Sequence, residues 1–129
     1  MNLQDVAYQD LRKAFKTLEA VLNEPKTEVV RDATIQRFEY TFEMSWKLMK
    51  RILNEEHRIE VFSPKMAFKR AAQVELIDDP RPWLGYLKVR NTTVHAYKES
   101  VIDEIYEKIK AFAPLVKDFL RRVEKDLGE

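Results

Sequence analysis

The sequence contains no cysteine and only two glycines in 129 residues. The absence of cysteine excludes disulfide bonds, thiolate zinc sites and a cysteine nucleophile, and it fits a reducing compartment. So little glycine excludes a glycine-rich phosphate loop and argues against a β-sandwich or a β-barrel. The chain is rich instead in Leu, Lys, Glu, Arg and Ala, which favour helices. We therefore predict an all-α protein.

Long apolar runs and an excess of one charge are also missing. No stretch reaches the roughly 18 uninterrupted apolar residues of a membrane span, and the first ten residues contain Asp5 and Asp10 without an apolar run. The 23 Lys and Arg residues nearly balance the 22 Asp and Glu residues, which disfavours tight nucleic-acid binding over the whole surface. We expect a cytoplasmic protein that does not contact membranes and whose RNA contacts are local.

Apolar residues recur at steps of three and four along most of the chain, as in amphipathic helices. A length of 129 residues with 45% hydrophobic residues suits one core, so residues 1–129 are predicted to form a single domain. The fold expected is an antiparallel up-and-down bundle of four to five helices. The predicted helices span about residues 3–22, 28–54, 64–74 and 82–90, and a last helix over 102–123 is kinked at Pro114.

Two short polar segments mark helix boundaries. Ser63-Pro64 is a helix start, because the serine oxygen caps free amides and proline fits a first-turn position that needs no donor. Asp78-Asp79 precedes a proline and has no histidine nearby in sequence, so it is interpreted as a turn and a helix cap rather than as a metal site. No metal or cofactor is expected.

The segment from Arg90 to Tyr97 gathers the chemistry that this histidine-poor chain offers. It lies within residues 80–98, which contain no Asp or Glu, so a locally positive surface for a phosphate is expected. Arg90 offers a planar donor fork to a phosphate, and the imidazole of His95 is the type of group that moves a proton. Asn91 is placed to orient either group. Lys88, Lys98 and, on a second acid-poor segment over residues 61–74, Lys65 are the expected phosphate and RNA contacts.

Arg90 and His95 are five positions apart, which on one continuous helix separates them by about 140°. The residues between them, Asn91 to Val94, are moderate or poor helix formers. We therefore predict that the helix ends or distorts between Arg90 and His95, so that both side chains are able to converge.

Other polar and aromatic residues have simpler interpretations. His57, flanked by charged residues after a helix, is expected to be solvated, and Arg31-Asp32 is expected to serve internal ion pairs. Trp83 and Tyr86 are of the type that stacks on bases, although a helical bundle needs such rings in its core first.

Taken together, the polar and aromatic signature of the chain resembles the HEPN superfamily, in the branch named as nucleotidyltransferase substrate-binding proteins. The resemblance covers nearly the whole sequence and is carried by Arg31–Glu43, Trp46-Lys47, Lys50, Ser63–Lys65, Leu76–Asp79, Trp83 and Arg90–Tyr97. One departure is Glu75, which stands where the family commonly has a glycine before the Leu-Ile pair.

This resemblance implies a helical bundle that forms a homodimer, with two copies of the Arg-Asn-x-x-x-His motif facing one cleft. Active relatives cleave RNA without a metal, which would make Arg90, Asn91 and His95 the catalytic residues. The resemblance also implies a partner, a minimal nucleotidyltransferase that acts as an antitoxin and adds AMP to the tyrosine matching Tyr97. Bulk and negative charge at that tyrosine would block the cleft.

Two further functions fit the same sequence. In the first, the chain is a non-catalytic subunit that presents a substrate to the nucleotidyltransferase, so that the cleft binds without cleaving. In the second, it is a helical dimerisation module with a vestigial motif.

Overall fold

The computed structural model describes residues 1–95 and 98–128, which form helices without any strand. The six helices of this described part are α1 (Val6–Leu22), α2 (Glu28–Glu56), α3 (Pro64–Gln73), α4 (Pro80–Thr93), α5 (Glu99–Ile109) and α6 (Phe112–Gly128). The all-α prediction is confirmed, and the first four predicted helices match α1 to α4.

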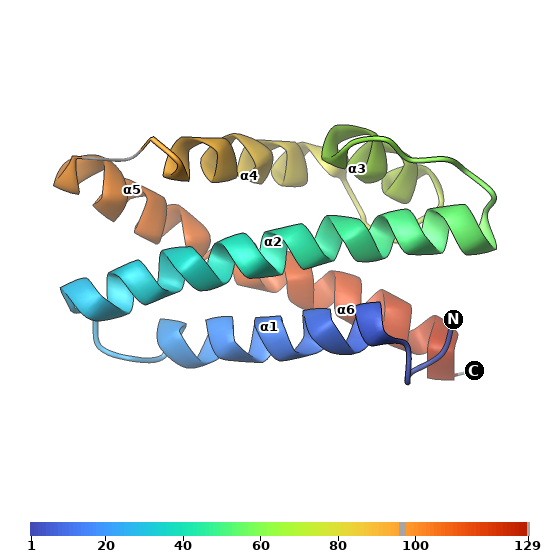
Figure 1. Ribbon diagram of the computed structural model, residues 1–129, viewed down its shortest axis with the longest axis horizontal. Helices are drawn as coiled ribbons and strands as arrows, with labels where there is room; N and C mark the ends of the chain where they lie inside the picture. The colour runs from blue at the N-terminus through green and yellow to red at the C-terminus, as the bar shows by residue number, and fades with distance from the viewer. Residues whose placement is uncertain (96–97, 129) are drawn as a thin grey trace.

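The long helix α2 lies at the centre of the bundle. Figure 1 shows α1 along one side of α2, α3 and α4 along the opposite side, and α5 and α6 together crossing behind it. The chain reverses direction from α1 to α2, from α2 to α3 and α4, and again into α5 and α6 (Figure 1). This is the predicted antiparallel up-and-down arrangement, with α5 and α6 forming one interrupted rod.

The predicted helix starts are confirmed by their capping bonds. The Ser63 side chain accepts a hydrogen bond from the N–H of Met66 at 3.2 Å. Asp79 accepts one from the N–H of Arg81 at 2.9 Å. The Arg81 guanidinium also bonds to this carboxylate and lowers the pKa of Asp79. The acidic pair before Pro80 therefore contributes a helix cap.

The last helix, predicted over residues 102–123 with a kink at Pro114, is instead divided into two helices. Helix α5 ends at Ile109, and α6 begins at Phe112. Pro114 explains the position of the break, because proline lacks an N–H and its ring clashes with the carbonyl four residues earlier, that of Lys110. The apolar seam continues across the break, since Ile109 and Phe112 are both fully buried.

Aromatic rings from three helices meet at this break. The Phe112 ring centroid lies 4.9 Å from that of Phe38 on α2 and 5.7 Å from that of Trp83 on α4. Tyr86 lies 5.0 Å from Phe112, and its hydroxyl donates to the carbonyl oxygen of Lys108 at 2.7 Å. Trp83 is 1% exposed, so its ring belongs to the core and is not available to stack on a base.

Within the described residues, none of the helices has both the length and the apolar composition needed to cross a bilayer. The core lies instead between α2 and the helices around it, where the large buried side chains gather. His57 ends α2 and is exposed, as expected.

Glu75 occupies the backbone position at which the resemblance suggested a glycine. Its φ angle is +64°, in the left-handed region that favours glycine. It follows α3 directly after Val74 and precedes Leu76, which is buried. The turn therefore keeps a glycine-like geometry although a β-carbon is present.

We expect Glu75→Gly to increase the free energy of unfolding by about 1 kcal/mol. A left-handed conformation costs a non-glycine residue about 1–2 kcal/mol, and the greater flexibility of unfolded glycine offsets about half of that gain. Urea unfolding followed by circular dichroism measures the change. Glu75→Val, with a β-branched side chain, is expected to lower stability. An unchanged or lower stability of Glu75→Gly would contradict the prediction.

Candidate active site at the end of α4

Helix α4 ends at Thr93, between Arg90 and His95, as the sequence predicted. The hydroxyl groups of Thr92 and Thr93 donate to the carbonyl oxygens of Lys88 and Arg90, at 2.9 and 2.7 Å. His95 follows in the turn, where its backbone N–H donates to the carbonyl of Thr92 at 3.0 Å. Such side-chain bonds to the backbone compete with helix continuation. They occur where α4 ends, between Arg90 and His95.

Arg90 is held by a carboxylate from the neighbouring helix. Its Nη2 atom forms an ion pair with Oε1 of Glu43 on α2, and its Nη1 atom donates to Oδ1 of Asn91 at 3.3 Å. The other Glu43 oxygen accepts a hydrogen bond from the indole N–H of Trp46 at 3.1 Å. The guanidinium is therefore fixed by a chain of contacts that starts on α2.

This arrangement modifies the positive surface expected from residues 80–98. That segment lacks acids in the sequence, but the fold supplies Glu43 to Arg90, and Arg81 pairs with Asp79. Lys88 is exposed and Lys98 is an exposed residue at the start of α5, and neither forms an ion pair within the described part of the chain. Part of the expected positive charge is thus neutralised at the motif itself.

Of the remaining predicted site residues, some lie near Arg90 and one lies on another helix. Asn91 contacts Arg90, and His95 is exposed in the turn that follows α4. Lys65 lies in the first turn of α3, which packs beside the start of α4 in Figure 1. Since α4 is about 20 Å long, the fold does not bring Lys65 to the Arg90 end, and its contact with RNA stays a prediction. Tyr97 lies outside the described residues.

A second ion-pair cluster holds the start of α5, just after the motif. Arg31, in the first turn of α2, is 5% exposed and contacts the carboxylates of Glu99 and Asp103 of α5. Its hydrogen bond to Glu99 is the main cause of a raised Arg31 pKa. Lys26 and then Arg31 lower the pKa of Asp103. The prediction that Arg31 serves internal ion pairs is confirmed.

From the sequence, Trp46 is expected to widen the apolar face of the second helix, and Glu43 is given no role. Both belong to the stretches that carried the family resemblance, and their spacing of three places them on one face of a helix. That spacing indicates that Trp46 is able to reach Glu43. It does not indicate that Arg90, which is 47 positions after Glu43, contacts Glu43. No group of three or more acidic or histidine side chains suited to a metal ion is found among the described residues.

Comparison with known proteins places the chain in a family. The profile described as nucleotidyltransferase substrate binding protein like matches residues 6–125. The chain belongs to this family. A crystal structure of a Thermus thermophilus protein is 37% identical, with a TM-score of 0.81, and the match covers 87% of this chain and 97% of that one. The resemblance to the nucleotidyltransferase substrate-binding proteins is confirmed.

Other family relatives carry functional descriptions. A Haemophilus influenzae structure described as a substrate binding domain of a nucleotidyltransferase is 26% identical, with a TM-score of 0.82, over 91% of this chain and 98% of that one. The probable ribonuclease HepT of Haemophilus influenzae is 33% identical over 82 residues, which are 60% of this chain and 56% of that protein.

One further structure shows the shared fold at lower identity. A tri-AMPylated HEPN toxin of Shewanella oneidensis, solved in complex with its MNT antitoxin, has a TM-score of 0.75. It is 16% identical, and the match covers 92% of this chain and 94% of that one. At this identity the similarity establishes the helical fold alone.

The Glu43–Arg90 contact leads to a prediction about anion binding. Glu43→Gln keeps the size of the side chain but removes the charge that opposes an anion at Arg90. One unit charge at about 4 Å is worth on the order of 1 kcal/mol near water, so inorganic phosphate should bind about fivefold more tightly. Chemical-shift titration of the Arg90 guanidinium by NMR measures this affinity. Glu39→Gln, one turn earlier on α2, is the control, and weaker phosphate binding by Glu43→Gln would contradict the prediction.

Proposed function

We propose that this protein is a metal-independent endoribonuclease that acts as a homodimer and is paired with a minimal nucleotidyltransferase. The observation that carries the proposal is the end of α4 at Thr93. It separates Arg90, which Glu43 and Asn91 hold in place, from the exposed His95 in the following turn. The probable ribonuclease HepT and the HEPN toxin among the similar proteins support this interpretation.

The residues suit cleavage of RNA by its own 2′-hydroxyl group. One His95 takes the 2′-hydroxyl proton while the oxygen attacks phosphorus, and the bond to the 5′-oxygen breaks. A second His95 protonates that leaving oxygen, so the products are a 2′,3′-cyclic phosphate and a free 5′-hydroxyl. Arg90 stabilises the charge that accumulates on the phosphorane, and Asn91 orients the phosphate.

This mechanism requires two subunits. Each chain has one copy of the motif and therefore one His95, whereas the reaction uses a base and an acid at the same phosphodiester. In the proposed homodimer two Arg90 side chains face one cleft. Lys88 and Lys98 contact the phosphates next to the cleaved bond, and Lys65 contacts RNA further along α3 and α4.

The partner in this proposal inactivates the ribonuclease by modification. A minimal nucleotidyltransferase adds AMP to Tyr97, two residues after His95, and the added phosphate brings negative charge and bulk to the cleft. The description of the Shewanella oneidensis toxin as tri-AMPylated and bound to its antitoxin supports this assignment.

A second candidate is a non-catalytic subunit that binds a substrate for the nucleotidyltransferase. The pairing of Arg90 with Glu43 favours it, because a neutralised arginine stabilises a phosphorane less strongly. The description of the Haemophilus influenzae neighbour as a substrate binding domain agrees with this role. A helical dimerisation module with a vestigial motif is the third hypothesis.

The ribonuclease proposal is tested with purified protein, a single-stranded RNA and excess chelator. We expect cleavage, and we expect His95→Ala to reduce its rate at least about 100-fold, the usual contribution of a general acid or base. His57→Ala removes the other histidine, which is exposed at the end of α2, and should leave the rate unchanged. Circular dichroism and sedimentation check that fold and dimer persist. Equal cleavage by His95→Ala would exclude the ribonuclease hypothesis.

The partner assignment is tested by mass spectrometry after incubation with the nucleotidyltransferase and ATP. We expect AMP-sized additions on the peptide that contains Tyr97, together with loss of RNA cleavage. Tyr97→Phe should abolish the additions, whereas Tyr40→Phe, which changes a half-exposed tyrosine on α2, should not. Absence of an adduct with a partner that consumes ATP would remove the antitoxin assignment.

A further inference from the structure

A groove runs between α1 and α6, away from the Arg90 site. Figure 1 shows α1 and α4 on opposite sides of α2, so the groove and the motif at the end of α4 belong to different faces of the bundle. The groove is therefore a surface separate from the Arg90 site.

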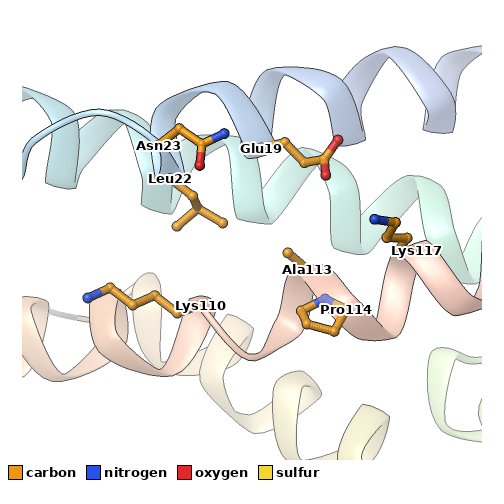
Figure 2. A pocket seen from close by; sticks show the side chains of 7 residues that line it. All are labelled: Glu19, Leu22, Asn23, Lys110, Ala113, Pro114 and Lys117. Atoms are coloured by element: carbon orange, nitrogen blue, oxygen red, sulfur yellow. The ribbon is translucent and has the colours of Figure 1, made fainter.

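The groove has an apolar floor. At one end Leu22 of α1 faces Ala113 and Pro114 of α6 across a hollow of about 420 Å³ (Figure 2). A neighbouring hollow of about 320 Å³ shares Glu19 and Lys117 with the first and is floored by Phe15 and Leu120. The two hollows adjoin and follow α1 from Arg12 to Asn23, a length of about 16 Å at 1.5 Å per residue.

Positive side chains surround this apolar floor. The lining includes two acidic residues, Glu19 and Glu124, and five basic residues, which are Arg12, Lys16, Lys110, Lys117 and Arg121.

Some of these charges are already engaged. Lys110 pairs with Glu107, Arg121 pairs with Asp118, and Glu124 accepts a hydrogen bond from Tyr8. Three of the basic residues have no ion pair with any residue that the structure describes, namely Arg12 and Lys16 on α1 and Lys117 on α6. Both sides of the groove, α1 and α6, therefore carry positive charge at its rim. An acidic occupant would complement this charge.

The composition of the groove distinguishes between two kinds of acidic partner. Single-stranded RNA binds by stacking its bases on exposed aromatic rings, but the one aromatic side chain lining the groove, Phe15, is only 6% exposed. An amphipathic helix instead buries aliphatic side chains in an apolar groove and keeps its charges at the rim. The apolar floor and basic walls therefore fit a helix better than RNA.

We propose that the α1–α6 groove is a docking surface for an acidic amphipathic helix of a partner protein. A segment of about three turns matches the length of the groove. Apolar residues at positions i, i+3 or i+4, and i+7 contact Leu22, Ala113 and Pro114, which are the accessible apolar residues of the first hollow. Asp and Glu residues on both flanks face Lys16 of α1 and Lys117 of α6.

The probe for this proposal is a synthetic 18-residue helical peptide with leucines at i, i+3, i+4 and i+7 and glutamates on both flanks. Isothermal titration calorimetry with the whole protein is expected to show saturable one-to-one binding per chain. Lys16→Glu combined with Lys117→Glu should weaken it at least about tenfold, because attraction becomes repulsion on both walls. Lys47→Glu with Lys69→Glu makes the same charge change on exposed positions of α2 and α3 and should leave binding unchanged.

A second variant tests the floor rather than the rim. Ala113→Glu places a carboxylate between the leucines of the peptide and should also abolish binding, with helicity checked by circular dichroism. A peptide of equal composition with scrambled leucine positions should not bind. Equal binding of the scrambled peptide, or of the Lys16 and Lys117 double variant, would overturn the proposal. So would an oligothymidine that displaces the peptide and needs the same lysines, since it would make the groove a nucleic-acid site.

Discussion

The packing of Phe112 between α2 and α4 is the contact on which the site depends. Only Trp83 of α4 is fully buried. Its ring packs against Phe68 of α3 and against Phe112, and Tyr86 packs against Phe112 as well. At the break before α6, the Lys108 carbonyl accepts a hydrogen bond from the Tyr86 hydroxyl in addition to that from the N–H of Ala111. Arg90 lies one turn after Tyr86 on the same face of α4, so the contact that places Tyr86 also places Arg90 against α2.

Helix α2 forms ion pairs with residues on both sides of the connection between α4 and α5. Glu43 holds Arg90 before this connection, and Arg31 holds Glu99 after it. Arg31 is almost fully buried and pairs with Glu99 and Asp103 of α5 and with Asp32 of α2, so carboxylates from two helices compensate its charge. The motif therefore sits on a frame that is fixed at two points of one long helix, which is the kind of support that a preorganised site requires.

The ion pair with Glu43 fixes the orientation of the Arg90 guanidinium and also neutralises its charge. Glu43 orients the guanidinium but also opposes any anion that approaches it, and Trp46 keeps the carboxylate in place. In the proposed ribonuclease, RNA is attracted by Lys88, Lys98 and the second subunit, while Arg90 acts once the phosphate has arrived. A protein of net charge +1 with paired arginines depends on such local geometry more than on a general positive field.

Helix positions, the caps at Ser63 and Asp79 and the end of α4 follow from the sequence, because periodicity, capping residues and helix propensity act over a few neighbouring residues. The Arg90–Glu43 pair does not, since it joins positions far apart in the chain whose approach depends on how α4 packs on α2. The same holds for the α5–α6 break. Pro114 predicts a disturbance, but the sequence does not show that α5 ends at Ile109 or that Phe112 then packs against Phe38 of α2. Local chemistry therefore determined the elements of this protein and its candidate residues, and tertiary packing decided which charges meet.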